Sequence, residues 1–153
     1  MKSSNTPAYS ETIMTEIVYP NDTNPMGVLN GGKILQWMDT ACAITAQLHS
    51  DIVCVTVAID AVQFTKPARL GDIVSIKAKV TRVFTSSMEI YAEATARRTS
   101  SGEFFPVTTA YFTFVALDTG SGTPMPIPQV TPVTAEEQRQ FEAALTRKKL
   151  RAR

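Results

Sequence analysis

A change of hydrophobic period near residue 50 constrains the fold of this chain more than any other feature. From Gly32 to His49 apolar residues recur every three or four positions, which predicts a helix with one core-facing stripe. Four later segments alternate apolar and polar residues and predict long strands, over 52–64, 73–84, 87–98 and 104–117. Because the helix and the strands are segregated in the sequence, it predicts an α+β fold with an antiparallel sheet.

The two ends of the chain add shorter elements. Residues 12–19 predict a first strand that stops at Pro20. The segment 118–133 holds four of the nine prolines, which predicts a semi-extended surface connection. Thr134 and Glu137 have the spacing of a capping box, so a short, peripheral amphipathic helix should follow. We expect one domain over 1–130 and a tail over 131–153.

One helix can cover only one face of a five-stranded sheet. The other face of the predicted strands still carries Val, Ile and Tyr residues. A partner subunit is the simplest way to cover that face, so we expect a homo-oligomer.

Composition excludes several classes of partner. Fifteen Lys and Arg against fourteen Asp and Glu give a net charge of +1, which argues against nucleic-acid binding. No apolar run reaches the length of a membrane span, and the first residues lack the apolar stretch of a secretory signal. Cys42 and Cys54 have no C-x-x-C spacing and are expected to be reduced and buried in a cytoplasmic protein.

A single histidine, His49, leaves no two-histidine metal site, and we expect neither a metal nor an organic cofactor. His49 ends the predicted helix, where it should interact with the helix C-terminal carbonyls.

The residues 20–43 contain the candidates for chemistry. Asp39 lies inside the helix between apolar neighbours one turn away, which suits either a functional carboxylate or a partly exposed helix acid. Asn24 lies in a Pro- and Gly-rich loop, either as a turn residue or as a site residue. Asn30 is the expected N-cap, and Gly31 and Gly32 place free N–H groups at the helix start, where they could stabilise a developing oxyanion.

Four segments together carry a family resemblance: 24–39, VTVAIDAVQFTKPARLGD at 55–72, FTSSMEIYAEA at 84–94, and YFTFVALD at 111–118. In this order they resemble the hotdog-fold acyl-CoA thioesterases of the cytosolic acyl-CoA hydrolase type, over roughly residues 10–130. The resemblance implies a long antiparallel sheet wrapped around a central helix. It also implies a homodimer, often assembled into a hexamer as a trimer of dimers, that hydrolyses acyl-CoA to a carboxylic acid and CoA.

The resemblance also assigns catalytic roles. Asp39 would be the general base or the nucleophile toward the thioester carbonyl, and Asn24 would orient the water or the carbonyl from the opposite subunit. The N–H groups of Gly31 and Gly32 would polarise the carbonyl oxygen. CoA is part of the substrate, so no separate cofactor is implied.

The same resemblance suggests substrate-binding residues. Thr56 matches a polar position lining the site, and Ser86 and Ser87 match a CoA-contacting turn. Lys66 stands where members often have Arg, which keeps the charge but loses a bidentate phosphate contact. Arg82 is a further candidate for the CoA phosphates.

Two other functions fit a hotdog fold. One is an acyl-CoA-binding or sensing module that does not cleave its ligand. The other is a dehydratase, which would need a catalytic histidine, and His49 is misplaced for that role.

Overall fold

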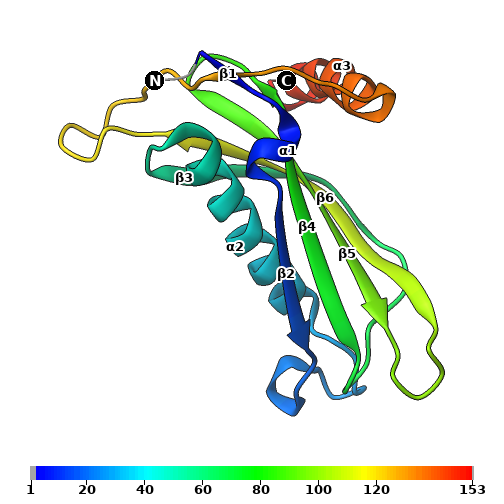
Figure 1. Cartoon of the computed structure of the whole chain (residues 1–153). Coiled ribbons are helices and arrows are strands. Elements are labelled where there is room, and N and C mark those ends of the chain that lie inside the picture. The colour runs from blue at the N-terminus through cyan, green and yellow to red at the C-terminus, as the bar shows by residue number, and fades with distance from the viewer. Residues whose placement is uncertain (1–2, 153) are drawn as a thin grey trace.

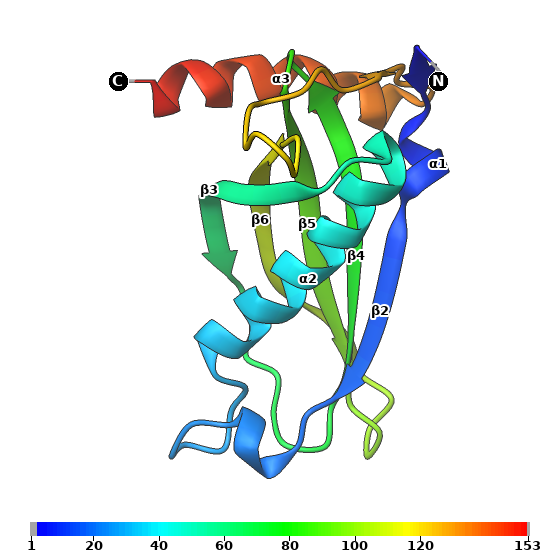
Figure 2. The same cartoon turned by 90° about the vertical axis from the view of Figure 1, so that its left-hand side faces the viewer.

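The computed structural model describes residues 3–152, and its centre is one long helix lying along a five-stranded antiparallel sheet (Figures 1 and 2). The helix is α2 (Gly31–Ser50). The strands, in their order across the sheet, are β2 (Thr12–Ile17), β4 (Ile73–Val83), β5 (Ser87–Arg97), β6 (Phe104–Ala116) and β3 (Cys54–Phe64). The predicted α+β order is confirmed.

Helix α2 forms where its cap and its apolar stripe predict it. The side chain of Asn30 accepts a hydrogen bond from Gly32 N–H at 2.9 Å and so caps the helix. The helix ends at Ser50 and is capped by Asp51, which adopts a left-handed conformation and donates its N–H to Gln47 O. Its buried stripe includes Ile34 and Met38, which belong to the same core as the inner faces of the strands.

The alternation of β5 and β6 places one set of side chains against α2. These residues are fully or almost fully buried: Met88, Ile90, Ala92, Ala94, Ala110, Phe112 and Phe114. Paired across the two strands, they form the centre of the core.

Strand β3 is an edge of the sheet and is irregular. It pairs with β6 on one side, and its register shifts between Thr56 and Ala58 and again between Asp60 and Gln63. Ala61, within the second shift, has a φ of +50°, in the region that favours glycine. Because β3 has a neighbouring strand on one side only, the outward-facing row of its backbone N–H and C=O groups pairs with no strand within the described chain. Most of its residues are also exposed.

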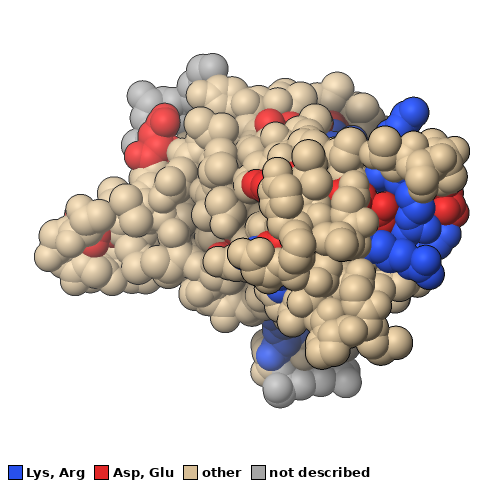
Figure 3. Space-filling model, turned by 90° about the horizontal axis from the view of Figure 1, so that it is seen from below, with Lys and Arg blue, Asp and Glu red and all other residues tan. Residues whose placement is uncertain are grey.

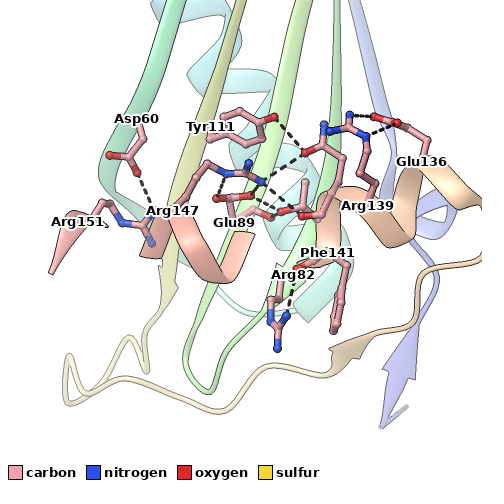
Figure 4. Close-up of polar contacts among 11 residues, drawn as sticks. Asp60, Arg82, Glu89, Tyr111, Glu136, Arg139, Phe141, Arg147 and Arg151 are labelled. Carbon is pink, nitrogen blue, oxygen red and sulfur yellow. Dashed lines mark hydrogen bonds and ion pairs between the residues drawn. The ribbon is translucent and has the colours of Figure 1, made fainter. Parts of the chain in front are cut away.

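The expected short C-terminal helix is α3 (Ala135–Arg151), and it packs on the sheet (Figure 4). Its predicted capping box is present, with Thr134 accepting from Glu137 N–H. Arg147 makes a bidentate ion pair with Glu89 on β5, a residue that is 0% exposed. Part of the outer sheet face is therefore covered by α3, where we had expected a partner subunit to cover it.

The N-terminal segment and the proline-rich segment meet at the end of α2. Strand β1 (Ser4–Asn5) pairs in parallel with β7 (Gln129–Val130). Two short helical turns, α1 (Pro7–Ser10) and η1 (Pro20–Asp22), flank β2. These four elements were not predicted, because pieces of two to four residues carry no readable period.

His49 is held by this junction, which corrects the expectation that its ring binds the helix C-terminal carbonyls. His49 Nε2 lies 2.8 Å from Pro128 O, and Asn5 Nδ2 donates to the His49 backbone carbonyl at 3.1 Å. The ring is 1% exposed, and burial lowers the pKa of His49 from its ordinary value, although the Pro128 carbonyl opposes this shift.

Within residues 3–152, no helix is long and apolar enough to cross a membrane.

Candidate active site

Asp39 and Thr56 are in direct contact. Thr56 Oγ1 on β3 donates a hydrogen bond to Asp39 Oδ1 on α2 at 2.6 Å. Asp39 is half-buried, at the margin between the core stripe of α2 and the exposed edge strand. The carboxylate is therefore oriented by a defined donor and remains open to a ligand arriving from the side of the β3 edge.

The neighbouring cysteine, Cys42, is not a second reactive group in this site. Cys42, one turn beyond Asp39, is 0% exposed and is a free thiol. Burial, together with the negative charge of Asp39, raises the pKa of Cys42 well above its ordinary value. The thiol therefore stays protonated and unreactive.

Asn24 forms a turn before α2 and keeps part of its side chain unused. Its Oδ1 accepts hydrogen bonds from Met26 N–H at 2.9 Å and Val28 N–H at 3.4 Å. Its Nδ2 group makes no hydrogen bond to any residue within 3–152, and neither atom contacts Asp39 of the same chain. The turn role is thus confirmed, while the amide nitrogen is left to donate to a ligand.

The two glycines at the start of α2 differ. Gly32 N–H is engaged by the Asn30 side chain. Gly31 N–H has no acceptor within the described chain, and this residue lines a cavity. Of the two predicted oxyanion donors, Gly31 therefore has its N–H group available.

That cavity has a volume of about 250 Å³ and lies between the start of α2, the segment after β3 and the start of β6. Its lining is mostly apolar and consists of Leu29, Gly31, Ile34, Phe64, Thr65, Lys66, Pro67, Ala68, Val107 and Thr108. Among the residues that the structure describes, no group of three or more His, Cys, Asp or Glu could hold a metal ion.

Comparison with known proteins identifies the family. The family model of the thioesterase superfamily matches residues 26–102, a span that contains α2, β3, β4 and Thr56. The chain belongs to this superfamily. Its hotdog architecture, with a sheet wrapped around the central helix, is confirmed by solved thioesterases.

Three comparisons describe the likeness. A Bacillus subtilis protein named as an uncharacterized acyl-CoA thioester hydrolase is 39% identical over 128 residues, covering 84% of this chain and 74% of that protein. An apo hexameric acyl-CoA thioesterase superposes with a TM-score of 0.94 at 39% identity, covering 99% of this chain and 96% of that one. The Staphylococcus aureus acyl-CoA hydrolase, solved with butyryl-CoA and CoA, superposes with a TM-score of 0.90 at 32% identity, covering 97% and 90%.

The residues expected to bind CoA in this thioesterase lie at two ends of the sheet. Ser86 lies in the β4–β5 turn and Ser87 begins β5, at the end of the sheet where α2 finishes, whereas Lys66 follows β3 near the start of α2 (Figures 1 and 2). One chain therefore does not bring these three residues together.

The basic candidates are already partnered. Lys66 pairs with Glu103 and lies 4.6 Å from the ring centre of Phe105. Arg82 donates to Phe141 O on α3 at 3.1 Å and stacks over the Phe141 ring at 4.1 Å (Figure 4). Seen from below, Lys and Arg side chains gather on one side of the molecule with carboxylates among them (Figure 3).

The site also contains a residue that sequence reasoning missed. Thr108 is 0% exposed, lines the cavity at Gly31, and its hydroxyl has no hydrogen-bond partner in residues 3–152. A threonine in a strand is ordinary, so the sequence holds no signal that singles it out.

Proposed function

We propose that this thioesterase hydrolyses acyl-CoA to a carboxylic acid and CoA, with Asp39 as general base or nucleophile. Acyl-CoA hydrolysis is the activity named for the relatives that match most of the chain. The observation that carries the role of Asp39 is its hydrogen bond from Thr56, which fixes a half-buried carboxylate at an open strand edge.

The geometry suits both versions of the chemistry. Oδ1 accepts the hydrogen bond from the Thr56 hydroxyl, so Oδ2 is left to take a proton from water or to attack the thioester carbonyl. The Staphylococcus aureus enzyme has been solved as alanine variants of an asparagine, an aspartate and a threonine. Those three positions are spaced along its sequence as Asn24, Asp39 and Thr56 are here, which supports a common site.

The length of α2 favours a site shared between two chains. Gly31 and Asp39 are eight residues apart on the helix, a rise of about 12 Å. Reacting atoms must approach to about 3.5 Å, so a carbonyl held by Gly31 N–H is out of reach of Asp39 in the same chain. We infer that Asn24 and Gly31 of one subunit face Asp39 and Thr56 of another.

Exposed apolar side chains support the dimer that such a site needs. Six of them on α2, on β3 and immediately before β3 are between 38% and 56% exposed, namely Ile44, Leu48, Val53, Val55, Val57 and Ile59. They accompany the unpaired edge of β3, and a second copy of the chain would cover both features. A trimer of such dimers would give a hexamer, the assembly named for one similar structure.

CoA is expected to lie across this interface. Bound by more than one chain, it could contact Ser86, Ser87 and Arg82 of one subunit and Lys66 of another, although these lie at separate ends of a single sheet.

A cytoplasmic location is our expectation, and the free, buried state of Cys42 and Cys54 agrees with it.

The test is steady-state hydrolysis of acyl-CoAs from acetyl to dodecanoyl by the purified protein, with thiol release as the readout. We expect turnover of at least one of them, and Asp39→Asn protein provides the background. Tight acyl-CoA binding by calorimetry with no thiol release would instead establish a binding or sensing module. Matched acyl-pantetheine thioesters should show a higher KM and a weaker salt dependence if cations hold the nucleotide.

A further inference from the structure

We propose that the cavity at Gly31 receives the acyl group, and that Thr108 makes the enzyme prefer short acyl chains carrying a hydroxyl or carbonyl group. This inference rests on the proposed thioesterase function and on Gly31 N–H as the donor to the thioester oxygen.

The position of the cavity fits the acyl side of the thioester. Gly31, at the first turn of α2, is part of the lining, so a carbonyl oxygen bound to its N–H would place the adjoining acyl carbons at the cavity. The remaining lining is dominated by apolar side chains, including Leu29, Ile34 and Phe64, which suits a hydrocarbon chain.

The volume limits the chain length. A cavity of 150 Å³ accommodates benzene, so about 250 Å³ holds on the order of ten carbon-sized atoms when filled. The cavity therefore suits short and medium acyl groups, and longer chains would have to leave it.

Thr108 introduces polarity at the inner wall. In β6 it lies on the same face as Ala110 and Phe112, which is the face that packs against α2. Its hydroxyl is buried and unpartnered within the described residues, unlike the hydroxyl of Thr45 on α2, which donates to Thr12 and to Ala78 O.

An unpaired hydroxyl is unfavourable once water is excluded. A saturated acyl chain filling the cavity would displace any water from Thr108 and leave the hydroxyl without a partner. An acyl chain with its own hydroxyl or carbonyl at that depth would supply the missing hydrogen bond. The discrimination between the two should be about tenfold, the effect of one such bond.

The chain provides a matched control in Thr113. This threonine, also in β6, is 5% exposed and has an unpartnered hydroxyl within residues 3–152. It lies opposite Glu89 in the register, on the face covered by α3 and away from the cavity. Its substitution therefore tests the loss of a buried threonine hydroxyl without a change in the acyl pocket.

The experiment compares kcat/KM for butyryl-CoA with 3-hydroxybutyryl-CoA, and for hexanoyl-CoA with its 3-hydroxy, 5-hydroxy and 3-oxo forms. The proteins are wild type, Thr108→Val, Thr108→Ser and Thr113→Val, each first checked for its melting temperature and oligomeric state. We expect wild type to favour at least one oxygenated chain by about tenfold, Thr108→Val to lose that preference, and Thr108→Ser and Thr113→Val to keep it.

Two outcomes overturn the inference while leaving the proposed function intact. One is that wild type and Thr108→Val hydrolyse the substrates with the same ratio of kcat/KM between oxygenated and saturated acyl chains. The other is an equal rise in KM for every chain in Thr108→Val, which would assign the cavity to the pantetheine arm of CoA. Absence of hydrolysis of every acyl-CoA would instead contradict the proposed function itself.

A second variant tests the pocket independently of Thr108. Ala68 is 0% exposed and lines the cavity, so Ala68→Leu should fill part of it. The preferred acyl length should then shorten by two or more carbons, whereas an unchanged length profile would place the acyl chain elsewhere.

Discussion

Thr56, on an exposed edge strand, donates a hydrogen bond of 2.6 Å from its hydroxyl to Asp39 Oδ1 in the central helix. This contact joins the two elements that a second subunit would approach, namely β3 and the adjoining face of α2. The orientation of the carboxylate is therefore tied to the position of the strand at the proposed interface.

Asp39→Asn should reduce kcat by about 100-fold or more, because an amide can neither accept the proton of water nor attack a carbonyl. The amide oxygen can still accept the Thr56 hydrogen bond, so the melting temperature should stay close to that of wild type. Retention of more than about a tenth of wild-type turnover would contradict a catalytic carboxylate.

Thr56→Val should lower kcat by about tenfold with little change in KM, because it removes the donor that orients the carboxylate while preserving the side-chain shape. Thr56→Ser retains the hydroxyl and should restore most of the activity. Equal activity of the Val and Ser variants would show that the hydrogen bond has no part in catalysis.

Mixing Asn24→Ala with Asp39→Ala protein should restore activity to two preparations that are each inactive. In a heterodimer, one of the two sites combines the intact Asn24 of one chain with the intact Asp39 of the other. The measurement is thiol release after subunit exchange, with exchange verified by mass spectrometry. A fully exchanged sample that stays inactive would rule out the shared site.

Arg147→Ala should destabilise the protein by about 3 kcal/mol, because it leaves the Glu89 carboxylate without its bidentate partner at a fully buried position. Arg139→Ala is the matched control on the same helix, since Arg139 and Glu136 are each 64% exposed and their pair should contribute little. Urea unfolding compares the two, and similar losses would mean that α3 is not anchored through Glu89.

Acid should destabilise the fold partly through His49. Burial lowers the pKa of His49 from its ordinary value of 6.5, so below that pH the unfolded chain binds the proton more readily than the folded one. The contribution of neutral His49 to the free energy of unfolding is complete above about pH 6.5 and is lost as the pH falls. Urea unfolding at pH 7.5 and 5.5 should show a smaller pH effect in His49→Gln than in wild type.

The central fold was predictable because it rests on local patterns. The stripe of α2 and the alternation of β5 and β6 each extend over ten or more residues, so the periods are unambiguous, and the Asn30 cap marks where α2 begins. The packing of α3 was not predictable, because it depends on Glu89 and Arg147, which are 58 positions apart. A single Glu in an alternating strand looks like a solvent-facing residue until the helix that buries it is known.

The site was predictable only in part, for the same reason. Asp39 stood out by its apolar neighbours, but Thr56 was named through family resemblance and is joined to Asp39 by the fold alone. The occupation of Gly32 N–H by Asn30 and the unpaired hydroxyl of Thr108 are properties of three-dimensional packing, with no counterpart in a one-dimensional pattern.

The pairing of β1 with β7 also sets an order of folding events. The Ser4 and Thr131 side chains, which meet at this junction, are 127 positions apart, so the contact closes a long loop. The entropy cost of closing that loop is large compared with what a pairing of two residues per strand can contribute. The junction can close only after the sheet and α2 have brought its ends together. During synthesis, Ser4 and Asn5 therefore remain without their β partner until Gln129 and Val130 have left the ribosome.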